Sequence, residues 1–112
     1  MNANEYQQLA LRTESKTESD TTRLLQGLMG LCGEAGECLD LLKKHMFQEH
    51  SLSRTHLMKE LGDVAWYLAV SADALGFSLD EIFEANIQKL RERYPNGEFE
   101  GDKSRNRKAG DV

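Results

Sequence analysis

The position of proline constrains the fold of this chain more than any other feature. Among its 112 residues there is a single proline, Pro95, so residues 1–94 lack the residue that breaks helices most strongly. No clear run in this stretch alternates apolar and polar side chains as a half-buried strand does. The sequence therefore predicts an all-α fold before Pro95.

Capping residues divide this stretch into four expected helices. The first covers residues 4–13, and the polar link TESKTESD connects it to a second helix over residues 20–46. Asp20 is the expected N-cap of the second helix, because its carboxylate can accept hydrogen bonds from the free backbone amides of the first turn.

The other two helices are bounded by similar signals. Ser53 is expected to cap a third helix, which ends before Gly76, a residue suited to the left-handed position after a helix. Ser78 and Glu81 have the spacing of a capping box, which predicts a fourth helix over residues 79–93.

These helices predict a four-helix, bundle-like subunit in one domain over residues 1–94, followed by an extended or disordered tail over residues 95–112. A short loop joins the second and third helices, so they should pack as an antiparallel central hairpin. VAWYLAV, residues 64–70, is apolar on nearly every side, and such a helix is buried on every side. We therefore expect this helix to pack against a second subunit as well, in an oligomer.

The charge distribution argues against a surface for nucleic acid. The formal net charge is -5, and the one basic cluster lies near residue 105, where a solvated tail is the simpler explanation. No segment reaches the ~18 apolar residues of a membrane span, and residues 1–10 lack the apolar core of a signal peptide. Cys32 and Cys38 point in different directions on one expected helix, so we expect free thiols. Together these features predict a soluble, cytoplasmic protein.

Two pairs of carboxylates lie in the middle of helices rather than at their ends. Glu34 and Glu37 are one turn apart on the second helix, and Glu60 and Asp63 are one turn apart on the third. Both pairs lie at similar distances from the connecting loop, so the hairpin should bring them to about the same level. Four carboxylates in a half-buried groove repel one another unless a cation joins them, and their hard oxygen atoms suit Mg²⁺ or Mn²⁺.

Glu34 lies beside the apolar face of its helix. The main apolar stripe of this helix consists of Leu24, Leu28, Cys32, Ala35, Leu39 and Leu42. A flanking row contains Leu31, Glu34, Cys38 and Leu41. The carboxylate of Glu34 is therefore expected at the border of the buried face.

Neighbouring residues refine this expectation. Di-iron helical bundles use Glu-x-x-His pairs, whereas the i+3 partners here are Glu37 and Asp63, so an all-oxygen site favours magnesium over iron. The three histidines are expected to be ordinary surface residues. Gly30, Gly33 and Gly36 either open space for a large ligand or allow close helix packing, and the sequence does not separate these two readings.

Two longer stretches carry a resemblance to a known family. GEAGE, residues 33–37, and KELGDVAWYLA, residues 59–69, resemble the E-x-x-E and E-x-x-D motifs of the MazG-like, all-α nucleoside triphosphate pyrophosphohydrolases. The resemblance continues through EANIQKLRERYPNGEF and covers roughly residues 20–100.

The resemblance implies an activity and a metal site. The activity is hydrolysis between the α and β phosphates of a nucleotide, which gives a monophosphate and pyrophosphate and serves to clean or regulate the nucleotide pool. The implied ligands of Mg²⁺, or of Mn²⁺, are Glu34, Glu37, Glu60 and Asp63. One carboxylate, Glu37 in first place and Glu34 in second, is expected to orient the attacking water as a general base. The family also implies a homodimer or homotetramer.

Further side chains are candidates for binding the nucleotide. Tyr67 shares a helix face with Glu60 and Asp63. It is expected either to bind the nucleotide, by stacking on the base or by donating its hydroxyl to the sugar or a phosphate, or to lie in a subunit interface. Asn86 and Lys89 are expected to bind phosphate, and Arg93 extends their polar row. Ordinary surface salt bridges are the alternative for this row.

Two other functions remain open from the sequence. One is a non-catalytic helical adaptor that binds a nucleotide or a protein, although an adaptor has no evident use for four crowded carboxylates. The other is a carboxylate-bridged redox bundle, which would contain iron and absorb visible light. Release of pyrophosphate from a nucleotide panel, with and without Mg²⁺, distinguishes the enzyme from both.

Overall fold

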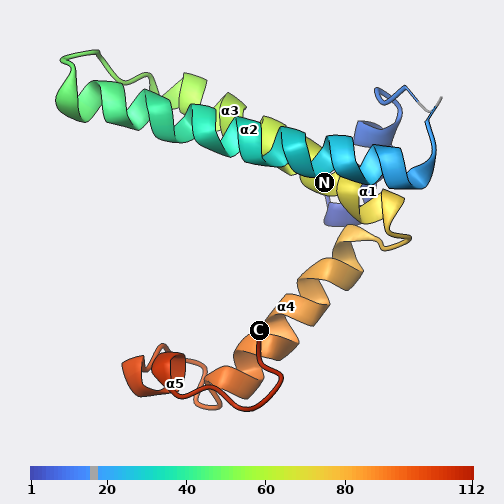
Figure 1. The fold of residues 1–112 in the computed structure, drawn as a ribbon, viewed down its shortest axis with the longest axis vertical. Helices are drawn as coiled ribbons and strands as arrows, with labels where there is room; N and C mark the ends of the chain where they lie inside the picture. The colour runs from blue at the N-terminus through green and yellow to red at the C-terminus, as the bar shows by residue number, and fades with distance from the viewer. Residues whose placement is uncertain (16–17) are drawn as a thin grey trace. The chain divides into compact units, whose positions relative to one another are not determined.

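The computed structural model describes residues 1–15 and 18–112, and within them every regular element is a helix (Figure 1). The helices are α1 (Ala3–Leu11), α2 (Asp20–Phe47), α3 (Arg54–Ala74), α4 (Leu79–Arg93) and α5 (Gly101–Arg105). The all-α prediction is therefore confirmed. Residues 16 and 17 of the expected polar link lie outside the described residues. None of the helices in the described ranges is both long and apolar enough to cross a membrane.

The chain divides into two compact units, Met1–Leu79 and Asp80–Val112. The first unit holds α1, α2 and α3, and the second holds α5 and all of α4 except its first residue. The expected domain over residues 1–94 stays a prediction. The region after Pro95 is not extended throughout, because it contains the short helix α5, for which the sequence offered no apolar periodicity.

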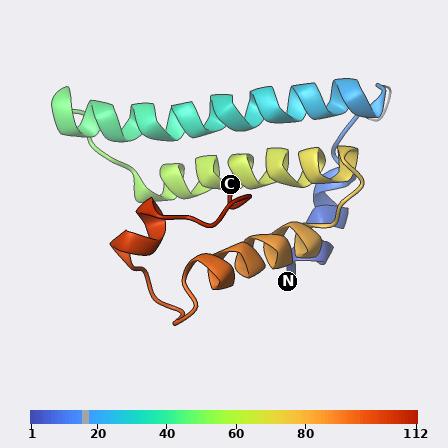
Figure 2. The ribbon, with the colours of Figure 1, turned by 60° about the horizontal axis from the view of Figure 1, so that its bottom comes forward.

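The α2/α3 hairpin dominates the first unit, and the two helices run side by side (Figures 1 and 2). Gly27 of α2 lies against Ser71 of α3, and one turn further Gly30 lies against the ring of Tyr67. Each step forward along α2 is thus matched by a step back along α3, as in an antiparallel pair. This register places Glu34 and Glu37 at the same level as Glu60 and Asp63, as the sequence predicted.

The first turn of α2 differs from the prediction. Ser19, not Asp20, is the N-cap, and its side chain accepts a hydrogen bond from the backbone amide of Thr22 at 3.2 Å. Asp20 is instead the first helical residue, where its carboxylate forms an ion pair with Arg23 at 2.8 Å. Both residues are good N-caps, and the competing attraction of Arg23 is the feature that a pattern of capping residues does not reveal.

The ends of α3 follow the prediction closely. Ser53 accepts a hydrogen bond from the amide of His56 at 3.1 Å, as an N-cap does. At the other end Gly76 has a φ of 85°, and the amide of Phe77 donates to the carbonyl of Ala72 at 2.9 Å. This Schellman arrangement needs a left-handed residue, which explains the glycine. The range of α4 also agrees with the prediction, while the capping box of Ser78 and Glu81 stays a prediction.

Helix α1 is fastened to the end of α3 by a buried glutamine. The amide nitrogen of Gln7 donates to the carbonyls of Ala69 and Phe77 at 3.1 and 3.2 Å, and its oxygen accepts from the amide of Leu79 at 3.1 Å. All three hydrogen bonds lie inside the first unit. A polar side chain that satisfies three backbone groups in this way replaces water at a helix end.

The apolar surface of α2 is arranged differently from the expectation. The row that contains Glu34 is half-buried and lies on the side of α3, whereas Leu28, Leu39 and Leu42 of the main apolar stripe are 49%, 68% and 40% exposed. Within α3 only residues 69–72 are fully buried, and residues 64–68 are half-buried. A single chain thus leaves most of its longest apolar stripe uncovered.

Candidate metal centre

Three carboxylates converge where α2 and α3 face each other. One carboxylate oxygen from each of Glu34, Glu37 and Glu60 lies within 4.8 Å of the others. Glu34 and Glu60 are half-buried, while Glu37 is exposed at the edge of the group. We call these three residues the acidic cluster. Asp63 is exposed and lies outside it, although its charge reaches both Glu34 and Tyr6 of α1.

The electrostatics of the acidic cluster show that the carboxylates compete for protons. A hydrogen bond with Glu60, partial removal from water and the nearby charges raise the pKa of Glu34 to about 7. The pKa of Glu60 is lowered, first by its hydrogen bond with Glu34 and then by Glu37 and His56. Below about pH 7, and in the absence of a cation, the pair therefore holds one proton, which Glu34 donates to Glu60.

The acidic cluster fits a divalent cation. The Oε2 atoms of Glu34 and Glu60 are buried, and neither accepts a hydrogen bond from the described residues. A buried acceptor without a partner is unfavourable, and a cation would satisfy both atoms at once. The donors are hard carboxylate oxygens, which suit Mg²⁺ or Mn²⁺ better than softer metals.

A shallow pocket of about 300 Å³ opens beside the acidic cluster. It is lined by Glu37, Asp40, Leu41, His56 and Glu60. The Nε2 atom of His56 lies 3.2 Å from Oε1 of Glu60, so this histidine is a neighbour of the acidic cluster rather than an isolated surface residue. Its position four residues before Glu60 on one helix is the signal in the sequence that could have indicated this contact.

The glycines of α2 differ in what surrounds them. A side chain at Gly30 would collide with the ring of Tyr67, so this glycine permits close helix packing. A methyl group added at Gly33 or Gly36 would meet no atom within 4 Å, so packing inside the chain does not require these two glycines. Close helix packing therefore explains Gly30, whereas the reading of Gly33 and Gly36 as room for a large ligand stays a prediction.

Tyr67 lies in the hairpin rather than on an open surface. Its half-buried ring packs on Gly30 and meets the ring of Trp66 edge-on, with ring centres 5.0 Å apart. The indole nitrogen of Trp66 donates to the hydroxyl of Thr13 at 2.8 Å. Tyr67 therefore supports the hairpin whether or not it also contacts a ligand.

The other three candidates belong to the second unit. Asn86 is exposed and Lys89 is half-buried on α4, so both side chains reach solvent at least in part. Arg93 makes a two-pronged ion pair with Asp111, with contacts of 2.9 and 2.7 Å. The roles of these three residues in binding a nucleotide stay predictions.

Arg23 is an important charged residue that the sequence motifs did not reveal. It is buried, and its guanidinium group forms ion pairs with Glu14, Asp20 and Asp73 at 2.7, 2.8 and 2.7 Å. These contacts join the chain after α1, the start of α2 and the end of α3, and they raise the pKa of Arg23. Its spacing of eleven residues from Glu34 puts it on the inward face of α2, which was the available signal.

Comparisons with known proteins agree with the motifs. The family model of the MazG nucleotide pyrophosphohydrolase domain matches residues 23–98, a range that includes the acidic cluster and α4. The chain is also similar to the Gene 37 protein of Mycobacterium phage L5, with 38% identity over an alignment of 77 residues; the alignment covers 65% of this chain and 68% of the phage protein. No solved structure matches the chain.

Proposed function

The chain belongs to the MazG nucleotide pyrophosphohydrolase family, and from this premise we propose that it hydrolyses a nucleoside triphosphate, or a related nucleotide, to the monophosphate and pyrophosphate. The observation that carries the proposal is the convergence of Glu34, Glu37 and Glu60 on one point of the hairpin. Such an enzyme would act in cleaning or regulating the nucleotide pool in the cytoplasm.

The proposed cofactor is Mg²⁺, with Mn²⁺ as a substitute. Glu34, Glu37 and Glu60 would hold it, and Asp63, on the same face of α3 as Glu60, would be a fourth ligand. When bound, the cation would polarise phosphoryl oxygens and lower the pKa of water. The buried, unpartnered oxygens of Glu34 and Glu60 support this assignment, because the cation would replace the proton that raises the pKa of Glu34 to about 7.

The carboxylates also have a role in proton transfer. We assign Glu37 as the group that would accept a proton from a water molecule approaching from solvent, and its exposure and its position in the lining of the pocket support this assignment. The water oxygen would bond to phosphorus, its proton would pass to the carboxylate, and pyrophosphate would leave as the α–β bridge breaks. Glu34 is the second candidate for this base.

The remaining candidates would bind the nucleotide. We assign Asn86, Lys89 and Arg93 to its phosphates, because amide, ammonium and guanidinium groups are donors for phosphate oxygens. Tyr67 would contact the base or sugar at its free edge. A nucleotide in the pocket of about 300 Å³ would have its polyphosphate beside the acidic cluster.

The assembly that we propose is a homodimer or homotetramer. The uncovered apolar side chains of the hairpin include Leu25, Leu28, Met29, Leu39, Met58 and Leu61, and their exposed fractions run from 49% to 68%. A contiguous apolar surface is a common sign of a protein interface. A second copy of the chain offers the same apolar stripe and satisfies both surfaces by symmetry.

Measurement of pyrophosphate release tests the proposed activity. The wild-type protein is incubated with a panel of nucleoside and deoxynucleoside triphosphates, with Mg²⁺ and with a chelator. We expect release that requires the metal and falls at least ~100-fold in Glu60→Gln, since a lost charge at the metal removes stabilisation of the phosphoryl group. Glu49→Gln, an exposed loop residue, is the matched control.

Three results would contradict the proposal. Nucleotide binding without release of pyrophosphate from any member of the panel would favour the adaptor. Full activity in Glu60→Gln would show that the acidic cluster is not the site, even if the protein is an enzyme. A visible absorption band from bound iron would favour a redox bundle.

A further inference from the structure

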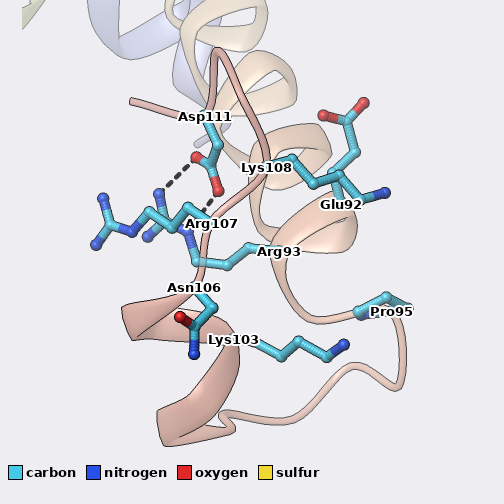
Figure 3. A pocket seen from close by; sticks show the side chains of 8 residues that line it. All are labelled: Glu92, Arg93, Pro95, Lys103, Asn106, Arg107, Lys108 and Asp111. Carbon is cyan, nitrogen blue, oxygen red and sulfur yellow. Dashed lines mark hydrogen bonds and ion pairs between the residues drawn. The ribbon is translucent and has the colours of Figure 1, made fainter.

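The second unit contains a half-buried ion pair whose geometry resembles that of an anion-binding site. The Nε and Nη2 atoms of Arg93 donate to Oδ2 and Oδ1 of Asp111 at 2.9 and 2.7 Å, so the carboxylate spans the Nε/Nη2 edge of the guanidinium group (Figure 3). Both side chains are only 11% exposed. A fork that grips a carboxylate in this way also matches two oxygens of a phosphate group.

The surroundings of this pair carry an excess of positive charge. A pocket of about 90 Å³ next to it is lined by Glu92, Arg93, Pro95, Lys103, Asn106, Arg107, Lys108 and Asp111 (Figure 3). Four of these side chains are cationic and two are carboxylates, one of which belongs to Asp111 itself. Without Asp111, four cations would face one carboxylate, which is an arrangement that attracts a polyanion.

The positive charges near Asp111 stabilise the ionised form of its carboxylate. The ion pair with Arg93, and then the charges of Arg107 and Lys89, lower the pKa of Asp111. A larger hollow of about 480 Å³ also borders Asp111 and is lined by Lys89 and Lys108 among others. Lys89 and Arg93 are residues that we assign to substrate phosphates, so the carboxylate of Asp111 lies among groups that would hold a phosphate.

Few backbone hydrogen bonds hold the segment that carries Asp111. Asp111 follows the end of α5, and its amide donates to the carbonyl of Lys108 at 3.0 Å in a turn where Gly110 has a φ of 86°. A short turn outside regular structure opens at low cost compared with a helix. Its position is therefore set largely by the ion pair with Arg93.

We propose that Asp111 is an internal occupant of an anion site, and that a polyphosphate displaces its carboxylate from Arg93 and releases the chain after α5. The inference deepens the proposed function and rests on the phosphate-binding role assigned to Arg93. The carboxylate of Asp111 then competes with the substrate for Arg93. The affinity for phosphate is therefore reduced by the free energy needed to break the Arg93–Asp111 pair.

Calorimetric titration with inorganic tripolyphosphate, without metal, tests the proposal on the full chain. Asp111→Asn removes the competing charge and should bind tripolyphosphate roughly tenfold more tightly than wild type, as expected when a charged hydrogen bond no longer has to be broken. Asp102→Asn removes the same charge from α5, where Asp102 bonds Asn106 rather than Arg93, and should stay within about twofold of wild type. Adding Arg93→Ala to Asp111→Asn should abolish the gain.

Hydrogen exchange provides a second readout on the wild-type protein. Saturating tripolyphosphate should speed exchange of the Asp111 amide, because the turn opens when the carboxylate is displaced. Equal affinities in Asp111→Asn and Asp102→Asn, or exchange that tripolyphosphate leaves unchanged, would overturn the proposal. The failure of the proposed function is distinguishable: it would appear as absent pyrophosphate release while the gain in Asp111→Asn remains.

Discussion

At the scale of single residues, Glu34 defines the site more than any other side chain. It lies on the inward face of α2, it touches Glu60 across the hairpin, and one of its oxygens is buried without a partner. A carboxylate in that position has two ways to be stable, since it can hold a proton or face a cation. A proton and the proposed metal would therefore compete for the same oxygens.

This competition predicts how stability depends on pH in the metal-free protein. The pKa of Glu34 is raised from 4.5 to about 7 in the folded state, so the folded protein binds the proton more tightly than the unfolded chain does. The contribution of Glu34 to stability is thus present below pH 4.5 and is lost as the pH rises to about 7. Melting curves in a chelator should show a lower melting temperature at about pH 8 than at about pH 5.5.

The control for this prediction is Glu34→Gln, which cannot titrate and should flatten the decline between about pH 5.5 and 8. Addition of Mg²⁺ to the wild-type protein at about pH 8 should restore the lost stability, because the cation replaces the proton. A decline that persists unchanged in Glu34→Gln would mean that another group is responsible.

At the scale of the elements, small residues fix the register of α2 against α3. Gly27 and Gly30 let the backbone of α2 approach Ser71 and Tyr67, and this close contact determines which carboxylates meet further along the hairpin. The sequence indicated both helices and their antiparallel pairing. It did not indicate which face of α2 turns inward, because the longer apolar stripe is the one that a single chain leaves exposed.

Two glycine substitutions in α2 should have opposite effects. Gly30→Ala places a methyl group in the ring of Tyr67 and should lower the free energy of unfolding by about 1–3 kcal/mol. Gly33→Ala enters open space and should raise it by up to about 1 kcal/mol, because alanine is the better helix former. Urea unfolding of both variants checks this, and equal effects would contradict the register described here.

The carboxylates that pair with Arg23 should differ in how much each contributes to the stability of the protein. The side chain of Glu14 is 9% exposed, whereas that of Asp20 is 75% exposed. Glu14→Gln should destabilise the protein by about 3 kcal/mol, because it leaves a buried guanidinium short of charge, while Asp20→Asn should cost less than about 1 kcal/mol. The comparison is made by urea unfolding, and a larger loss in Asp20→Asn would be incompatible with the buried network.

Local signals explain which parts of these elements were predictable. Ser53 and Gly76 bound α3 by interactions within a few residues, so a pattern of residue types was sufficient. Gln7 forms a hydrogen bond with a residue 62 positions away in the sequence, and Arg23 forms one with a residue 50 positions away. A local sequence pattern does not predict such contacts. The acidic cluster was accessible because two short motifs each placed a pair of carboxylates on one helix face.

At the scale of the whole molecule, the uncovered apolar stripe is the main feature that a single chain does not explain. The described core contains few large side chains, and its buried apolar residues are Ala10, Leu11, Ala69, Val70, Ala72 and Leu79. Association would bury further apolar surface at about 25 cal/mol per Å² before its entropic cost. The apolar segment VAWYLAV predicted that α3 packs against a second subunit, but the exposed apolar surface lies chiefly on α2.

Substitution in the stripe should change the oligomeric state. Leu39 is 68% exposed in the single chain, and Leu39→Glu would place a charge in the centre of the proposed interface. Sedimentation velocity should show a dimer or tetramer for wild type and a shift to monomer for this variant. Leu9→Glu, at a 45% exposed position of α1, is the matched control, and a monomeric wild-type protein would exclude the proposed assembly.

The most direct test of the central claim is the position of a bound metal. Crystals grown with Mn²⁺ are measured at a wavelength where manganese scatters anomalously, so that its location does not depend on interpretation of the surrounding density. The account predicts an anomalous peak among the carboxylates of Glu34, Glu37 and Glu60, which disappears in Glu34→Gln crystals. A peak at another place, or a wild-type hairpin that takes up no manganese at about pH 8, where the carboxylates are ionised, would contradict it.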